Sequence, residues 1–323
     1  MLRKTGSYLL NDETATAARA STARIKHILK LHLDWLNQRP GRARADLRSA
    51  TLNDVDLRNA DLRMALLQGA VFLDGDISDA NLAGAQLDSA DFRQAIAARV
   101  DFSSAHAGNV KFDGAILTGS MFAETQIVDC TFRQAHMEGV RLLDAVLYRC
   151  EFTGAQLGGA AFHQAKITEC TFREAVLEDA SFPHARVQLT HFSSVNATGC
   201  NFSNAKLLNS SFVRCDLAGA KFNRAVLSKT EFLRSSLRNC DLRDAVAECT
   251  DFCASMLQGA RFSGANLFAA DLRGANLSGA REMTGDQLSK ARTSDATILP
   301  NGRPGPFLKH SGSEKAMGNY RVS

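Results

Sequence analysis

The large hydrophobic positions of the chain recur every five residues. Stepping by five from Leu47 to Leu277 gives 47 positions that hold 21 Leu, 17 Phe, 4 Ala, 3 Ile, one Met and one Val, and none is polar. The residue two places earlier, from Ala45 to Ala275, is always small. A period of five fits neither an α-helix nor a long alternating strand. It predicts a short extended segment followed by a corner, repeated without interruption.

The extended segments predict which side chains face inward. In an extended trio the outer two side chains point one way and the middle one points the other way. Ala45 and Leu47 are therefore expected inside, and Asp46 outside. Each segment then contributes one large and one small inward group, a combination that lets a narrow interior pack densely.

The positions of phenylalanine fix the number of sides in each coil. From Phe92 to Phe262, 16 of the 18 large positions spaced ten residues apart are Phe, and the 17 large positions between them contain none. Only a coil of four sides returns Phe to the same two opposite faces each time. We therefore predict a square tube with two aromatic and two aliphatic columns. The expected core includes Leu82, Phe92, Phe102, Phe112, Phe122, Phe132, Phe152, Phe162, Phe172, Phe182, Phe192, Phe202, Phe212, Phe222, Phe232, Phe252 and Phe262.

The repeat itself has a familiar form. The segments ARADLRSATLNDVDLRNADLRMA and SGANLFAADLRGANLSGA follow A(D/N)LxxA(D/N)Lxx and resemble the pentapeptide-repeat family. The resemblance covers residues 45–279 and implies an all-β solenoid, a right-handed quadrilateral β-helix, which agrees with the four-sided count. At about 4.8 Å per stacked coil, about 12 coils make a rod roughly 55 Å long. The gyrase-protecting plasmid members of this family have loops that interrupt the helix, and this sequence has none.

Both ends of such a rod need a cap, because stacked coils end in exposed backbone edges and apolar core. Residues 14–40 predict a capping helix, and Pro40-Gly41 ends it. A basic amphipathic helix for a membrane or partner is the alternative. Residues 280–307 predict a C-terminal cap with a short helix near 286–291, whereas residues 1–13 are expected to be flexible and 308–323 disordered. The apolar positions of the N-terminal helix are Ile25, Ile28, Leu29, Leu33 and Leu36.

Charge is distributed unevenly along the chain. Residues 1–44 carry 9 Lys+Arg and 3 Asp+Glu, residues 45–279 carry 22 and 27, and residues 280–323 carry 7 and 4. A body with a net charge of -5 lacks the concentrated basic face that nucleic-acid binding requires, so no direct nucleic-acid binding is expected. No apolar run approaches the ~18 residues of a membrane span, and no secretory signal is visible. These features predict a cytoplasmic protein, with secretion by a signal-less route left open.

Residues able to support chemistry form no recognisable constellation. Paired CxxC, HExxH, GxSxG and phosphate-loop patterns are missing from the sequence, so we expect no metal, no cofactor and no enzymatic activity. Cys249 and Cys253 fall outside the inward set and are expected to be the accessible thiols. The other six cysteines take small inward positions and are expected to act as small buried hydrophobes: Cys130, Cys150, Cys170, Cys200, Cys215 and Cys240.

Outward residues spaced 20 apart should stack into ladders. Stacked like charges are mildly unfavourable, so such ladders are either solvated faces or docking stripes for an oppositely charged partner. The outward pairs Ile96/Ile116 and Val226/Val246 offer small contact or self-association surfaces. The charged ladders, our candidate partner-binding residues, are Lys166, Arg186 and Lys206 on one face and Glu231, Asp251 and Asp271 on another.

These observations predict a non-catalytic scaffold that mediates protein-protein interaction through its regular outer faces. One alternative, permitted by the family resemblance, is a modulator or protector of DNA gyrase that mimics duplex DNA. Mimicry needs acidic faces, and a body of -5 between basic ends provides them weakly. A secreted effector or a secretion-system accessory protein is the third alternative, without a sequence marker.

Overall fold

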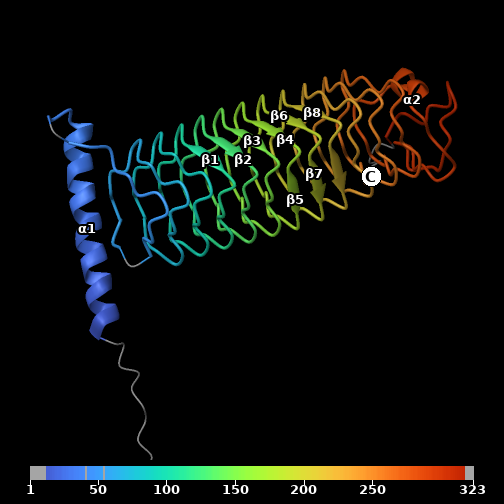
Figure 1. The fold of residues 1–323 in the computed structure, drawn as a ribbon. Helices are drawn as coiled ribbons and strands as arrows, with labels where there is room; N and C mark the ends of the chain where they lie inside the picture. The colour runs from blue at the N-terminus through green and yellow to red at the C-terminus, as the bar shows by residue number, and fades with distance from the viewer. Residues whose placement is uncertain (1–11, 41, 54, 317–323) are drawn as a thin grey trace, which may run out of the picture.

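The computed structural model describes residues 12–40, 42–53 and 55–316, with side chains described from residue 23 onward. It is a rod of stacked coils with a helix lying across its N-terminal end (Figure 1). The helices are α1 (Asp12–Leu36) and α2 (Gly285–Lys290). The strands are β1 (His106–Gly108), β2 (Gln126–Val128), β3 (Val146–Tyr148), β4 (Lys166–Thr168), β5 (Thr171–Arg173), β6 (Arg186–Gln188), β7 (His191–Ser193), β8 (Lys206–Leu208) and β9 (Ser211–Val213).

Successive coils pair in parallel, each residue with the one 20 positions later. Asp46 pairs with Leu66, and the same column advances in 20-residue steps to Asn266, which makes twelve rungs. The predicted quadrilateral β-helix is therefore confirmed. Where pairing is most regular, two parallel sheets form on adjacent sides, in the orders β1-β2-β3-β4-β6-β8 and β5-β7-β9.

Each corner is made by a residue in the left-handed region of backbone space. Asp79 has φ 61° and Gln94 has φ 58°, and Gly takes the same place at Gly114, with φ 66°. Left-handed φ is unfavourable for most side chains, so the surrounding bonds must hold it. At most corners one of these is a turn hydrogen bond, such as the Ala80 amide to the Ile77 carbonyl at 3.0 Å. The repeated corner keeps all four sides in register.

The side that carries the six-stranded sheet closes its corners differently. After β1, β3, β4 and β6 the buried amide donates to a side chain of the next coil instead of a turn carbonyl. The Cys150 amide donates to Cys170 Sγ at 3.4 Å, and the Cys170 amide to Thr190 Oγ1 at 3.4 Å. The buried cysteines of this column therefore satisfy backbone donors in addition to filling space.

The interior is filled by aromatic and aliphatic columns. One column runs from Phe72 to Phe252, and its successive rings stack with centroids 4.3 to 5.4 Å apart. Rings of the opposite column meet it edge-on, as Phe92 and Phe102 do at 5.8 Å. Leu82 and every phenylalanine of the expected core are buried. Stacked and edge-on rings each contribute about 0.5–1.5 kcal/mol beyond area burial.

Helix α1 lies against the first coil through a small set of side chains. Ile25 is buried, and Ile28 and Leu29 pack partly against the core. The expectation that Leu33 belongs to this face is wrong, because Leu33 is 49% exposed. The neighbouring His32 is buried instead, and its Nδ1 accepts the Ala45 amide at 3.1 Å, which closes part of the open backbone edge.

The C-terminal end is closed by α2 and the segment that follows it. Thr284 and Gln287 form a capping box at the start of α2, and Gln287 Nε2 donates to the carbonyls of Phe262 and Ala265 at 2.8 Å each. Beyond α2, Arg292 and Ile298 continue the pairing of the last coil. Residues 308–316, expected to begin a disordered tail, fold back so that the Asn301 amide donates to the Ser313 carbonyl at 3.3 Å. Residues 1–11 and 317–323 lie outside the described residues.

Candidate functional site: a column of unpaired cations

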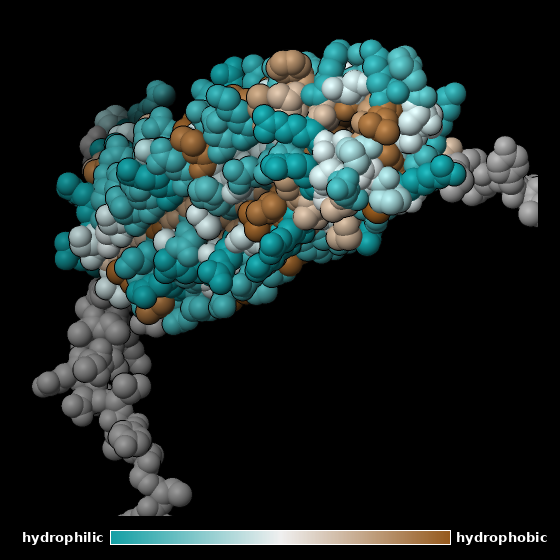
Figure 2. Space-filling view, turned by 90° about the vertical axis from the view of Figure 1, so that its right-hand side faces the viewer, coloured by the Kyte–Doolittle hydropathy of each residue, from teal (hydrophilic) through white to brown (hydrophobic). Residues whose placement is uncertain are grey.

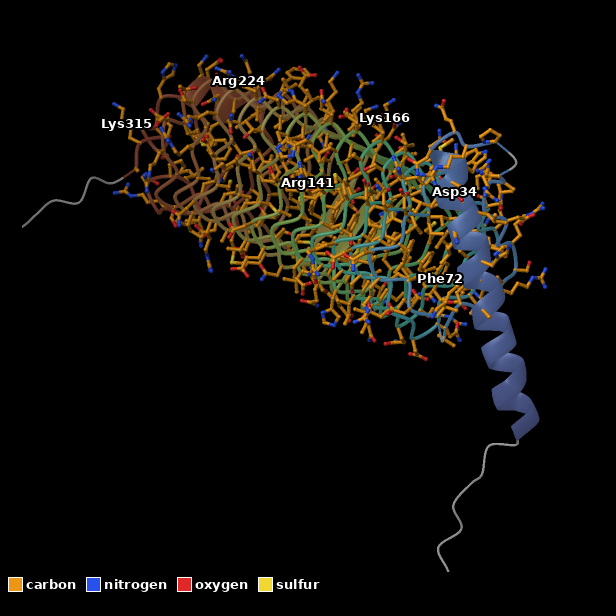
Figure 3. The ribbon with its side chains drawn as sticks, turned by 90° about the vertical axis from the view of Figure 1, so that its left-hand side faces the viewer. Asp34, Phe72, Arg141, Lys166, Arg224 and Lys315 are labelled. Atoms are coloured by element: carbon orange, nitrogen blue, oxygen red, sulfur yellow. The ribbon has the colours of Figure 1, made fainter. Side chains whose placement is uncertain are left out.

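Three adjacent strands bring the predicted basic ladder together. Lys166 begins β4, Arg186 begins β6 and Lys206 begins β8, and the parallel register places each directly against the next. The middle residue of each strand, such as Ile167, points inward and is buried, so the cations must point outward. Figure 3 shows Lys166 at the rim of the solenoid. We call Lys166, Arg186 and Lys206 the basic column.

The basic column lacks the counter-charges that accompany most other arginines of the body. Arg93 lies 2.6 Å from Asp91 two residues earlier, and Arg149 lies 2.6 Å from Asp129 on the preceding coil. The Arg93 guanidinium holds the pKa of the Asp91 carboxyl below its usual range. Among the described residues, no carboxylate comes within 4.0 Å of a basic nitrogen of Lys166, Arg186 or Lys206.

The cations border a hollow of about 420 Å³ on the outer surface, which they share with the neighbouring corner. Its acidic residue, Asp144, accepts a hydrogen bond from Gln164 Nε2 at 3.1 Å and so is engaged within the hollow. The remaining lining residues are His184 and Asn204, both held at corners with positive φ. None of the lining residues carries a hydroxyl or thiol, so the hollow offers charged groups, amides and one imidazole.

The acidic ladder also forms but differs from the basic column. Glu231 pairs with Asp251, and Asp251 with Asp271, in parallel register. Asp271 is 2.5 Å from Arg273, which lowers the pKa of its carboxyl to about 2. Asp251 and Asp271 flank Cys253, and burial together with these carboxylates raises the pKa of that thiol to about 12. The acidic ladder is thus partly neutralised by its own neighbours.

The cysteines occupy the positions that the sequence predicts. Six are buried, Cys249 is exposed and Cys253 is partly exposed. Burial raises the pKa of Cys130, Cys200 and Cys240, which keeps these thiols protonated. Within residues 12–40, 42–53 and 55–316, no three His, Cys, Asp or Glu side chains are grouped so that they could hold a metal ion. In the same part of the chain, neither helix has the length and apolar character needed to cross a bilayer.

Sequence reasoning missed several side chains that border the basic column. Val146 lies on the rung before Lys166, and Tyr148, Leu189 and Leu208 lie on the same side or its corner. Val146 is 36% exposed and Leu189 43% exposed. The 20-residue spacing that defines the ladder also places Val146 next to it, so the signal was present in the sequence.

Comparison with known families agrees with the repeat geometry. The family model described as pentapeptide repeats (8 copies) matches residues 43–72, 60–94, 80–119 and 248–281, and the pentapeptide repeat region model matches residues 105–182, 145–222 and 165–241. Together they cover well over half of the chain. The chain belongs to the pentapeptide-repeat family. No curated protein matches this pentapeptide-repeat chain.

A solved pentapeptide-repeat structure, that of HetL, shares the fold. HetL, a pentapeptide repeat protein involved in heterocyst differentiation regulation from the cyanobacterium Nostoc sp. strain PCC 7120, matches at 22% identity and a TM-score of 0.56, covering 77% of this chain and 93% of HetL. Rfr23 from the cyanobacterium Cyanothece 51142 matches at 23% identity and a TM-score of 0.26, covering 28% and 60%. Full-length QnrB1, a plasmid-mediated fluoroquinolone resistance protein, matches at 18% identity and a TM-score of 0.22, covering 56% and 84%.

Proposed function

We propose that this pentapeptide-repeat protein is a non-catalytic scaffold that binds another protein through the basic column. The supporting observation is that Lys166, Arg186 and Lys206 stack on adjacent strands, and that no carboxylate in the part of the chain that the structure describes lies within 4.0 Å of their basic nitrogens. Holding like charges on neighbouring rungs disfavours the fold slightly. A partner that brings carboxylates to these rungs removes the repulsion, so the arrangement favours binding over isolation.

The solenoid supplies rigidity to this surface. Each cation sits at the start of a strand whose central residue is buried and whose backbone is bonded to both neighbouring coils. The backbone positions of the three cations are therefore fixed before the partner arrives, and only their side chains lose freedom on binding. Such preorganisation lowers the entropic cost of association. The exposed charges also accelerate encounter with an oppositely charged surface.

The filled interior supports a non-catalytic role. Packed phenylalanine and aliphatic columns occupy the space inside the tube, so no enclosed cleft is provided there for a substrate. The hollow beside the basic column is open and is lined by charged and amide groups and one imidazole, without a hydroxyl or thiol nucleophile. These features favour recognition of a surface over covalent chemistry.

The gyrase-directed alternative is less well supported by the surface. A mimic of duplex DNA needs long rows of uncompensated carboxylates, whereas Asp91, Asp241 and Asp271 are each paired with the arginine two residues later. Figure 2 shows a C-terminal face that is largely hydrophilic with small separate hydrophobic patches. This alternative is tested by a supercoiling assay, and an effect of the protein on gyrase at micromolar concentration would favour it over the scaffold proposal.

Affinity capture from cells that produce the protein tests the proposal. The triple variant Lys166→Ser, Arg186→Ser, Lys206→Ser should lose a protein that the wild type retains. The matched control Lys111→Ser, Arg214→Ser, Arg234→Ser removes three exposed cations from other sides and should retain it. Equal capture by the wild type and both variants would discard the basic column as the binding surface.

A further inference from the structure

The basic column is bracketed by valines. Val146 precedes Lys166 by one rung, and Val226 and Val246 follow Lys206 on the next two rungs of the same column. The six residues from Val146 to Val246 therefore present an apolar end, three cations and a second apolar end. At about 4.8 Å per rung this stripe is roughly 24 Å long.

A second row of outward residues runs beside the cations, from Tyr148 through Thr168 and Gln188 to Leu208. Tyr148 and Leu208 end strands β3 and β8, and Leu189 occupies the corner after β6. Polar Thr168 and Gln188 stand beside Lys166 and Arg186, so the apolar members of the row lie at its two ends. The Arg149 guanidinium lies over the Tyr148 ring, 4.6 Å from its centroid. Charged and apolar side chains thus follow one another along the solenoid axis on a single side of the tube.

Resting on the proposed scaffold function, we infer that the partner contributes an extended acidic segment with aliphatic residues on both sides of its acidic run. This segment lies along the solenoid axis. A run of four acidic residues spans roughly 10 Å in an extended chain, close to the two rung spacings that separate Lys166 from Lys206. The flanking aliphatic residues then reach Val146 at one end and Val226 and Val246 at the other.

The same stripe is a poor fit to a nucleic-acid strand. Phosphates recur along the whole length of such a strand, but the cations stop after three rungs and valines follow on both sides. Phosphates placed over valine would lose water without gaining a counter-charge. The net charge of -5 on the repeat body disfavours a polyanion further. A protein segment that contains both acidic and aliphatic residues can contact the three cations as well as the valines on either side of them.

Fluorescence anisotropy with the full-length protein and synthetic probes tests the inference. The first probe is the labelled peptide Leu-Val-Glu-Asp-Glu-Asp-Val-Leu, which extends to roughly 26 Å. The second replaces its acids with the corresponding amides, the third replaces its aliphatic residues with serine, and the fourth is a labelled oligothymidine of eight nucleotides. We expect the first to bind, the amide peptide to bind at least about tenfold more weakly, and the oligothymidine not to bind.

Variants of the protein separate the two halves of the stripe. Lys166→Ser, Arg186→Ser, Lys206→Ser should abolish binding of the acidic peptide, whereas Val226→Ser with Val246→Ser should weaken the aliphatic-flanked peptide by roughly fivefold and leave the serine-flanked peptide unchanged. Circular dichroism and thermal melting check that the triple variant and the double variant are folded. Binding of the amide peptide as tight as the acidic one, tighter binding of oligothymidine, or failure of the acidic peptide to bind would each overturn the inference.

The outcome also separates this inference from the proposed function. If cellular capture depends on the basic column while the acidic peptide fails to bind, the scaffold proposal stands and the extended acidic segment is wrong. If capture is independent of the basic column, the scaffold proposal itself fails at this surface.

Discussion

Lys166 and Arg186 face each other across adjacent parallel strands, in register, without a carboxylate within 4.0 Å of either side chain among the described residues. Elsewhere on the solenoid a typical arginine, such as Arg243, is held by an aspartate two residues earlier, 2.6 Å away. Like charges directly opposite on neighbouring strands destabilise a sheet. The basic column is therefore a surface feature that the fold tolerates and does not need.

Replacing the central cation should make the free protein more stable. Arg186→Thr removes the repulsion on both neighbouring rungs and introduces a residue that suits strands, so the free energy of unfolding should rise by about 0.5 kcal/mol. Chemical denaturation at low ionic strength measures this, and the gain should shrink at 0.5 M salt because screening already relieves the wild type. A loss of stability in Arg186→Thr would show that the guanidinium supports the fold.

The buried cysteine column should be sensitive to loss of its acceptor atom. Cys170→Ala removes the sulfur that accepts the Cys150 amide, so an unsatisfied buried donor should cost about 1–3 kcal/mol. Cys170→Ser keeps an acceptor of similar size and should stay closer to the wild type. Urea unfolding of the two variants checks this, and equal stability of Ala and Ser would show that the sulfur only fills space.

The phenylalanine column should tolerate a smaller apolar residue but not a charge. Phe172 stacks between Phe152 at 4.6 Å and Phe192 at 4.8 Å. Phe172→Leu should fold with a lower Tm, because leucine already occupies Leu142 and Leu242 in the opposite column. Phe172→Asp should fail to fold, since an unpaired charge would be buried. A soluble Phe172→Asp protein that melts like the wild type would contradict the closed, filled tube.

Acidification should loosen the N-terminal cap. Burial lowers the pKa of His32, while the Arg63 carbonyl and Asp61 oppose this shift and Arg44 reinforces it. The unfolded chain therefore binds a proton below pH of about 6.5 that the folded cap still excludes, so stability is fully present above that pH and falls as pH decreases toward the folded pKa. Protonation also removes the acceptor for the Ala45 amide.

Thermal melts between pH 7.5 and pH 4.5 check the cap prediction. The wild type should lose Tm across this range, whereas His32→Phe should start lower and show a flatter dependence, because position 32 then no longer titrates. The paired aspartates, whose pKa values are lowered, contribute only at more acidic pH. An identical pH slope in both proteins would exclude His32 as its origin.

The five-residue period was sufficient to predict the solenoid, its four sides and the identity of the core columns. These features depend on how side chains fill the interior, and the volumes of Leu, Phe and Ala can be read from the sequence. The residues through which the capping helix packs are harder to predict, because they depend on what the helix contacts. His32 is buried and Leu33 is exposed, since His32 accepts the hydrogen bond of the Ala45 amide. The five-residue repeat also does not predict the hydrogen bonds of the cysteine column, since cysteine and alanine fill the same small inward position.

For the charged ladders, too, the sequence predicts the positions of the residues but not their local contacts. The 20-residue spacing predicted that Lys166 and Arg186 stack, but it could not predict which ladder keeps free charge. That difference depends on local partners, such as Arg273 beside Asp271, and on corner residues such as Gln164 that engage the nearest carboxylate.

Site-specific photocrosslinking tests the central claim, that the six-stranded side is the surface on which a partner protein docks. A photoreactive amino acid at position 188, two residues after Arg186 on β6, should give a defined crosslinked species in cells that produce the protein. The same amino acid at exposed position 178, on the opposite side, should give none. Adducts from position 178 and not from position 188, or identical adducts from both, would contradict the account.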